Sequence, residues 1–192
     1  MNNNHIKGAT ILLSSGNYFD YLNPLPETVT IEDIAKGLSN NCRFGGQCPV
    51  FYSVAEHSVL MSYCVSKENS YDALMHDAAE AFIMDMPKPL KNILPDYQIV
   101  EERVEKMLSK KFNFPLHKCE EVAIFDRRML MAEQRQLMKN RDAWSVIEGL
   151  EPANILIECW EPRLAEVKFL NRYYELVGEQ NESQHRSILQ SS

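Results

Sequence analysis

Apolar residues recur at helical spacing along most of the chain, which predicts a protein built mainly from helices. The best-defined stripe consists of Tyr71, Leu74, Met75, Ala78, Ala79 and Phe82. Steps of three and four positions place these side chains on one face of a helix, and that face should be buried. We expect the helix to begin after an N-cap at Ser70 and to end near Asp85, before the proline-rich run from Met86 to Pro89.

Similar patterns predict the other helices. These run from Thr30 to about Asn40, after Ser53 along VAEHSVLMSYCV, from about Asp96 to Phe112, from Leu116 to about Lys139, and from Ala165 to Leu176. Thr30 and Ser53 are candidate N-caps. Near the amino end, the β-prone stretch Ala9–Leu13 precedes Gly16 and Asn17, which predicts a small hairpin or extended arm. The expected fold class is therefore all-α, a helical bundle with a short N-terminal arm.

The length and composition predict one domain. A chain of 192 residues with 45% hydrophobic residues is large enough to bury a core and ordinary for a globular protein. Beyond Gly178 the composition turns polar, in NESQHRSILQSS. We therefore expect a domain over residues 1–178 and a flexible tail over residues 179–192.

The charge and the cysteines narrow the class of partner and the compartment. A net charge of −7 argues against binding to polymeric nucleic acid, which favours a basic surface. The sequence has no apolar run of membrane length and no signal-like start, so we expect a cytoplasmic protein, or one of the host cytoplasm if it is viral. Five cysteines without a C-x-x-C pair predict reduced thiols. A homo-oligomer is left open.

The pair His76-Asp77 is the most informative feature for chemistry. Glu80 follows four residues after His76 on the same expected helix, and Asp85 lies at its end. A purely structural helix rarely places such a group of ionisable side chains beside its buried face. The alternative is a set of surface carboxylates and one histidine with satisfied nitrogens.

Two further candidate ligands lie on other apolar helices. His57 stands in line with Val54, Met61 and Cys64, and Asp126 interrupts a stripe that includes Phe125 and Met129. Two imidazoles and two carboxylates form a mixed nitrogen and oxygen set, which suits a divalent ion such as Mn, Fe, Co or Zn. The alternatives are a core histidine and a salt bridge from Asp126 to Arg127 or Arg128, although sequence neighbours on a helix point apart.

The loop from Asn41 to Tyr52 is a candidate phosphate-binding element. It contains Arg43, Phe44, Gly45 and Gly46. Paired glycines let backbone N–H groups approach an anion, and the arginine side chain offers two donors to phosphate oxygens. Phe44 is a candidate for stacking on a base. A simple turn and ordinary packing are the alternatives for these residues.

Taken together, FYSVAEHSV, LMHDAAEAFIMDMPKPLK and Asp126 resemble the HD-domain metal-dependent phosphohydrolases. The match runs from about Ile31 to Met138 and is similar to a small branch of 5'-deoxynucleotidases and phage dATP triphosphohydrolases. The resemblance implies an all-helical HD-domain bundle. It also implies metal ligation by His57, His76, Asp77 and Asp126, catalysis by Glu80 and Asp85, and phosphate binding by Arg43.

The function expected from this resemblance is metal-dependent hydrolysis of a small deoxynucleotide. A deoxynucleoside triphosphate triphosphohydrolase with a dATP preference comes first, and a 5'-nucleotidase on deoxynucleoside monophosphates is the alternative. From another class, a metal-bearing nucleotide sensor with vestigial hydrolysis also fits. The cofactor would be Co, Mn, Zn or Fe, with a second Mg or Mn left open. Pro87, Lys88 and Pro89 would wall the pocket, and Lys88, Lys91, Arg127 and Arg128 would add charge unless they are simply solvated.

Overall fold

The computed structural model describes residues 8–190, and side chains through residue 179. It confirms an all-α fold with a short N-terminal arm, in which strand β1 (Thr10–Leu12) pairs antiparallel with β2 (Tyr18–Asp20). The helices are α1 (Ile31–Asn40), α2 (Val54–Ser62), α3 (Ser70–Met75), α4 (Glu80–Ile83), α5 (Lys88–Lys91), α6 (Pro95–Phe112), α7 (Glu120–Leu137) and α8 (Pro162–Gln190). Short 3-10 turns lie at η1 (Pro26–Thr28), η2 (Arg43–Gly46), η3 (Lys67–Asn69) and η4 (Ser145–Ile147).

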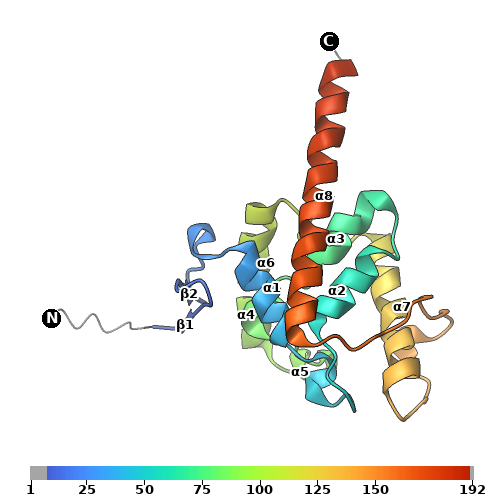
Figure 1. The fold of residues 1–192 in the computed structure, drawn as a ribbon. Coiled ribbons are helices and arrows are strands. Elements are labelled where there is room, and N and C mark those ends of the chain that lie inside the picture. The colour runs from blue at the N-terminus through green and yellow to red at the C-terminus, as the bar shows by residue number, and fades with distance from the viewer. Residues whose placement is uncertain (1–7, 191–192) are drawn as a thin grey trace.

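The core forms where α1, α2 and α3 pack around α8, with the hairpin and α7 on opposite sides of this group (Figure 1). The largest hydrophobic cluster includes Ile34, Leu38, Val54, Leu74 and Phe169, all fully buried. A smaller cluster joins α2 and α3 to α7 and contains Met61, Ala73, Val122, Met129 and Ala132. Helix α7 is thereby fixed against the face of α2 and α3 that carries the candidate ligands.

Two of the predicted N-caps are confirmed. The Thr30 side chain accepts a hydrogen bond from the backbone N–H of Asp33, whose carboxylate accepts from the Thr30 N–H in return. Ser53 accepts from the backbone N–H of Glu56. The third predicted N-cap was wrong, because Ser70 lies inside α3 and its hydroxyl donates to the Ser66 carbonyl.

The single helix expected from Ser70 to Asp85 is two helices. Helix α3 ends at Met75 and α4 begins at Glu80. Between them the backbone tightens to three-residue hydrogen bonds, from Ala78 N–H to the Met75 carbonyl at 3.0 Å and from Glu80 N–H to the Asp77 carbonyl at 2.9 Å. The apolar stripe stays on one side because the turn remains close to helical, so periodicity could not reveal the break.

Other helix boundaries also differ from the expected ones, most clearly those of α7 and α8. Helix α7 begins at Glu120 instead of Leu116, which leaves Lys118 in the loop that follows α6. Helix α8 continues to Gln190, past Gly178, where we expected the domain to end. Side chains from residue 180 onward and the last residues, 191 and 192, lie outside the described part, so the flexible tail remains a prediction.

A buried carboxylate attaches the segment before α8 to α2. Glu56 is fully buried and accepts hydrogen bonds from the backbone N–H groups of Glu158, Cys159 and Trp160 at 2.9, 3.0 and 2.6 Å. Cys159 adopts a left-handed backbone conformation, with φ of 58°, at the centre of this turn. The donors compensate part of the cost of burying the charge.

No helix within residues 8–190 has both the length and the apolar character needed to cross a bilayer.

Gly37 permits α1 to approach α4 closely, which generates a stability prediction. A Cβ at Gly37 would lie 2.5 Å from the Ala81 carbonyl oxygen and 2.7 Å from the Ala81 Cβ. We expect Gly37→Ala to lower the free energy of unfolding by about 1–3 kcal/mol because overpacking outweighs the better helix propensity of alanine. Urea denaturation measures the change.

Gly178→Ala is the matched control, since Gly178 also lies in a helix but has nothing within 4 Å of an added Cβ. It should raise the free energy of unfolding by up to about 1 kcal/mol. Equal effects of the two substitutions would contradict the close approach of α1 and α4.

Candidate metal centre

Side chains from three separate elements converge at one point. His57 comes from α2, His76 and Asp77 from the turn between α3 and α4, and Asp126 from the middle of α7. One ligand atom each from His57, His76 and Asp126 lies within 4.8 Å of the other two, so this group could hold a metal ion. Asp77 Oδ2 joins it, 2.9 Å from His76 Nε2 and 3.8 Å from His57 Nε2. Asp126 Oδ1 lies 3.5 Å from His57 Nε2 and 4.0 Å from His76 Nε2.

These separations fit a small divalent cation. Ligands about 2.0–2.2 Å from a common ion stand about 3–3.5 Å apart when adjacent and about 4.0–4.4 Å apart when opposite in an octahedron, so separations of 2.9 to 4.0 Å can accommodate one ion. Both Nε2 atoms are buried and have no hydrogen-bond partner. An unpartnered buried nitrogen is costly unless something absent from the protein atoms binds it, and a cation at the centre of the cluster would do so.

The other nitrogen of each imidazole is already engaged. His57 Nδ1 lies 2.6 Å from Glu133 Oε1, and His76 Nδ1 lies 2.7 Å from the Ala73 carbonyl oxygen. Because a carbonyl or carboxylate oxygen accepts, each Nδ1 carries a proton, and in the neutral ring Nε2 keeps a lone pair that can bind a cation. Such outer partners fix the tautomer and the ring orientation in metal sites.

The electrostatics of the cluster also favour a cation. Burial and Arg43 lower the pKa of His57, but Glu133 and Asp126 outweigh them and raise it to about 9. Burial raises the pKa of Asp77 and Asp126, yet their interactions with His76 and Lys118 outweigh burial and hold both below their ordinary range. The surroundings that retain a proton on His57 would equally retain a divalent ion.

Glu133 is a residue of the candidate site that the sequence analysis missed. It is fully buried and accepts from Arg43 Nη2 at 2.9 Å and from the Tyr52 hydroxyl at 3.0 Å, besides its contact with His57. Burial raises its pKa, but Arg43 and His57 outweigh burial and lower it to about 2. The available signal was spacing, because Glu133 follows Asp126 by two helical turns and shares its face of α7.

Arg43 lies beside the cluster, although part of its guanidinium is engaged. One amino group pairs with Glu133, while Nη1 is 3.9 Å from Asp77 Oδ2. Its Nε is buried without a partner. The guanidinium therefore keeps one donor without a protein acceptor, and the phosphate-binding role stays a prediction.

Glu80 and Asp85 have the properties of proton-transfer groups. Burial and the charges of Asp77 and Asp85 raise the pKa of Glu80 well above its usual value, and its Oε2 is buried without a partner. Burial raises the pKa of Asp85 as well, against the opposing charge of Arg43. Carboxyl groups shifted toward neutrality are suited to general acid–base catalysis.

A strained turn positions Asp85. The preceding Met84 has φ of 69° and ψ of 156°, a region that side chains other than glycine rarely adopt. The Tyr21 hydroxyl donates to the Phe82 carbonyl at 2.7 Å, and the Tyr97 hydroxyl lies 3.1 Å from the Met84 carbonyl oxygen. These contacts hold the end of α4 and the strained residue just before Asp85.

A cavity of about 150 Å³ adjoins the cluster. Its lining is almost entirely charged and consists of His76, Asp77, Ala79, Glu80, Lys91, Glu101, Glu105 and Lys118. Lys91 and Glu101 form an ion pair at 2.5 Å, and burial together with Glu101 raises the pKa of Glu105 to about 6. The cavity therefore offers room for part of a polar ligand beside the ligand atoms.

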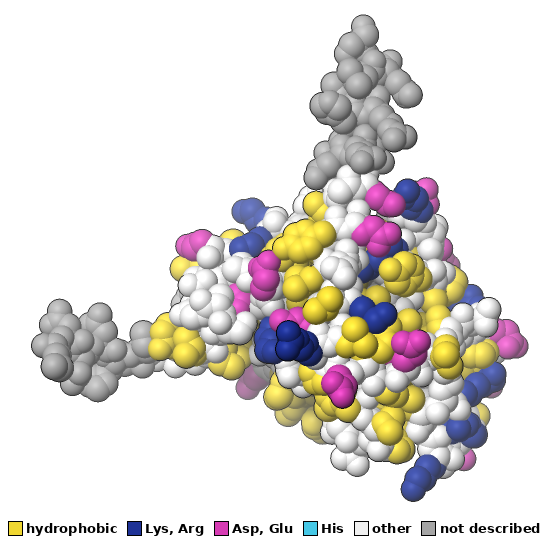
Figure 2. Space-filling view, viewed as in Figure 1, with side chains coloured by type: hydrophobic (Ala, Val, Ile, Leu, Met, Phe, Trp, Pro, Cys, Tyr) yellow, Lys and Arg dark blue, Asp and Glu magenta, His cyan; other side chains and the backbone are white. Residues whose placement is uncertain are grey.

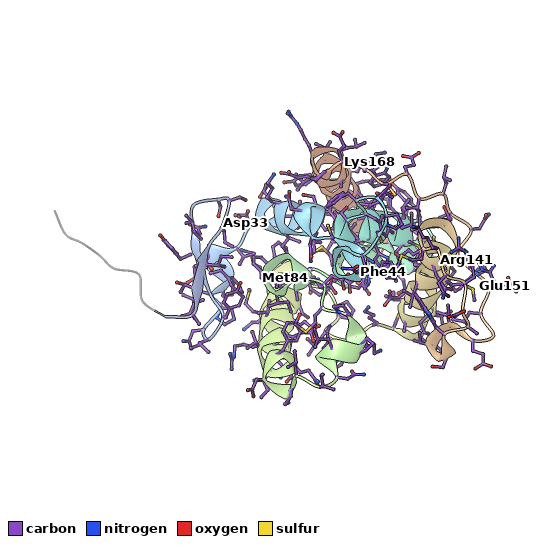
Figure 3. The ribbon with its side chains drawn as sticks, turned by 90° about the horizontal axis from the view of Figure 1, so that it is seen from below. Asp33, Phe44, Met84, Arg141, Glu151 and Lys168 are labelled. Atoms are coloured by element: carbon purple, nitrogen blue, oxygen red, sulfur yellow. The ribbon has the colours of Figure 1, made fainter. Side chains whose placement is uncertain are left out.

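The remaining predicted binding residues lie around this region. Phe44 is half-buried in η2, with its ring 6.5 Å from that of Trp144, and Figure 3 labels it in a view from below. Gly45 and Gly46 are exposed and have positive φ. Within the described side chains, no hydrogen bond or ion pair links Lys88 or Arg127 to the cluster; both are exposed, as is Pro89, and Arg127 donates to the Ala123 carbonyl. The structure therefore places Arg43 beside the cluster, whereas Lys88, Pro89 and Arg127 are exposed and make no described contact with it.

The fold and the cluster define an all-helical protein with a candidate site for a divalent cation. No family model matches the chain. It is 39% identical over 165 residues to the uncharacterized protein YfdR of Escherichia coli (strain K12), an alignment that covers 84% of this chain and 92% of the relative. An uncharacterized protein of Rhodobacter capsulatus is 34% identical over 120 residues, or 57% of this chain and 61% of that protein. The chain therefore belongs to the YfdR family.

The contact between Glu133 and His57 generates a binding prediction. We expect Glu133→Gln to lower the affinity for Mn²⁺ or Co²⁺ by about tenfold to a hundredfold, because the amide orients His57 less firmly and removes a negative charge. Isothermal titration calorimetry of the chelator-treated protein measures the change.

Glu121→Gln provides the control on the same helix. Glu121 accepts hydrogen bonds from Ser66 and Asn69 and makes no described contact with the cluster. It should alter stability but leave cation affinity unchanged. If both variants bind the ion as the unaltered protein does, Glu133 has no role in orienting a ligand.

Proposed function

We propose that this protein is a metal-dependent phosphohydrolase of the HD-domain type that acts on deoxynucleotides. The observation that carries the proposal is the pair of buried, unpartnered Nε2 atoms facing two carboxylates, with Glu80 at the start of α4 and Asp85 just beyond its end. A divalent ion of the Mn, Fe, Co or Zn class suits this ligand set. When bound, it supplies charge stabilisation for a phosphate and lowers the pKa of water toward neutrality.

The residues of the chain supply the remaining chemistry. Glu80, buried with one free carboxyl oxygen, accepts the proton of the attacking water. Asp85 donates a proton to the leaving oxygen, and the raised pKa of both carboxyl groups allows either of them to carry that proton. Arg43 supplies a positive charge beside the cluster for a phosphate, and Phe44 offers a ring for a base. The roles of Glu80 and Asp85 are interchangeable on geometry alone.

The reaction proposed first is release of triphosphate from a deoxynucleoside triphosphate such as dATP, in keeping with the resemblance. One observation favours hydrolysis of deoxynucleoside monophosphates as the second candidate. The cavity beside the cluster has four carboxylates and two lysines in its lining, so additional phosphates there would meet like charge. Acidic and basic side chains are interspersed on the face in Figure 2, and the net charge of −7 supports a small substrate over a polymeric nucleic acid.

Two substitutions test the proposal through different readouts. We expect Asp77→Ala to lower both metal content and turnover, because it removes a ligand. Glu80→Ala should retain the metal yet reduce turnover by about two to four orders of magnitude, the range for a general acid–base group. Elemental analysis and phosphate release report the two quantities, and full metal occupancy in Asp77→Ala would count against the assignment.

A product screen separates the candidate reactions. The protein with Mn²⁺ or Co²⁺ is given deoxynucleoside mono-, di- and triphosphates, and the products are identified by ³¹P NMR. Triphosphate release supports the first candidate, and orthophosphate from monophosphates supports the second. Tight nucleotide binding without hydrolysis would favour a sensor and overturn the enzymatic proposal.

A further inference from the structure

Lys118 occupies the side of the cluster opposite the imidazoles. Its Nζ lies 2.6 Å from Asp126 Oδ2 and 3.4 Å from Asp77 Oδ1. The other oxygen of each carboxylate, Asp126 Oδ1 and Asp77 Oδ2, faces the two Nε2 atoms. One ammonium therefore binds the outer oxygens of both carboxylate ligands and leaves one inner oxygen on each.

The charge balance gives this contact a specific consequence. Arg43, the other cation near the ligands, pairs at 2.9 Å with Glu133 and stands 3.9 Å from Asp77. Lys118 is therefore the cation in closest described contact with both ligand carboxylates. With neutral imidazoles, two carboxylates and a divalent ion sum to zero, and Lys118 makes the loaded centre positive toward a phosphate.

Occupied outer oxygens also limit how a carboxylate can bind a cation. A carboxylate with both oxygens free can hold an ion through both of them, whereas one that is hydrogen-bonded by an ammonium offers a single oxygen. Catalytic centres need open positions for water and substrate, so additional protein oxygens on the ion would be inhibitory.

We propose that Lys118 is a positioning residue that keeps Asp77 and Asp126 one-oxygen ligands and so preserves open coordination positions on the ion. The inference rests on the proposed cation site. It adds a residue that determines how many coordination positions on the ion remain free for water and substrate. It differs from an ordinary surface ion pair in one respect: removal of Lys118 strengthens cation binding while it impairs the centre.

The test compares Lys118→Met and Lys118→Arg with the unaltered protein. Competition with a chelating dye gives the Mn²⁺ dissociation constant, and water-proton relaxation gives the number of exchangeable waters on the bound ion. Lys118→Met should bind Mn²⁺ about tenfold more tightly or better, since an opposing charge is lost and ligand oxygens are gained. Its bound ion should hold fewer exchangeable waters, and inorganic phosphate should bind the loaded protein more weakly. Lys118→Arg should restore all three quantities toward those of the unaltered protein.

Lys106→Met is the control, because Lys106 pairs at 2.6 Å with Glu102 on the exposed side of α6. It should change none of the three quantities. If Lys118→Met does not fold, Lys118→Gln carries the same test with a shorter neutral side chain.

The outcomes separate this inference from the proposed function. Mn²⁺ binding by the unaltered protein, with equal or weaker binding and an unchanged water number in Lys118→Met, overturns the role of Lys118 alone. Failure of the unaltered protein to bind Mn²⁺, Co²⁺ or Zn²⁺ overturns the cation site and this inference with it. Tighter binding with fewer waters in Lys118→Met, restored in Lys118→Arg, establishes it.

Discussion

The interaction on which the rest of the site depends is the enclosure of the Glu133 carboxylate. A fully buried carboxylate without partners would cost several kcal/mol, and this one is satisfied by Arg43, Tyr52 and His57. Those partners come from the loop after α1 and from α2, while Glu133 itself comes from α7. Because the buried Glu133 carboxylate must reach these partners, its position fixes the register of α7 against α2. Because Asp126 lies two turns earlier on the same helix, the same requirement sets the position of a candidate ligand.

The sequence predicted those parts of the fold that follow from local rules. Thr30 and Ser53 could be recognised as caps because each needs only a short polar side chain before an apolar stripe. The break between Met75 and Glu80 could not be recognised, because a change from four-residue to three-residue hydrogen bonds leaves the apolar positions almost in phase. The start of α7 was also misplaced, since Leu116 continues the apolar pattern through a loop.

The candidate site was predictable to the extent that its residue types are unusual. His57, His76 and Asp126 stand out as polar groups on apolar stripes, and the structure brings them together. Glu133 and Lys118 were missed for a different reason. A glutamate near the end of a helix and a lysine in a loop are ordinary surface residues by composition, and only tertiary contacts give them a role. Lys88 and Arg127 are close in sequence to the candidate ligands, yet both are exposed. Closeness in sequence alone therefore did not predict a contact with the cluster.

The N-terminal hairpin lies at the outer edge of the molecule in Figure 1, yet the residues at its end contact α4. The Tyr21 hydroxyl donates to the carbonyl of Phe82, three residues before Asp85, and the ring of Phe19 stacks on that of Phe82 at 4.6 Å. The N-terminal arm thus packs against the segment of α4 that precedes Asp85. Although the arm lies outside the helical core, its contacts with Phe82 constrain its sequence. A change in its length or the loss of Phe19 or Tyr21 would therefore alter the packing of α4.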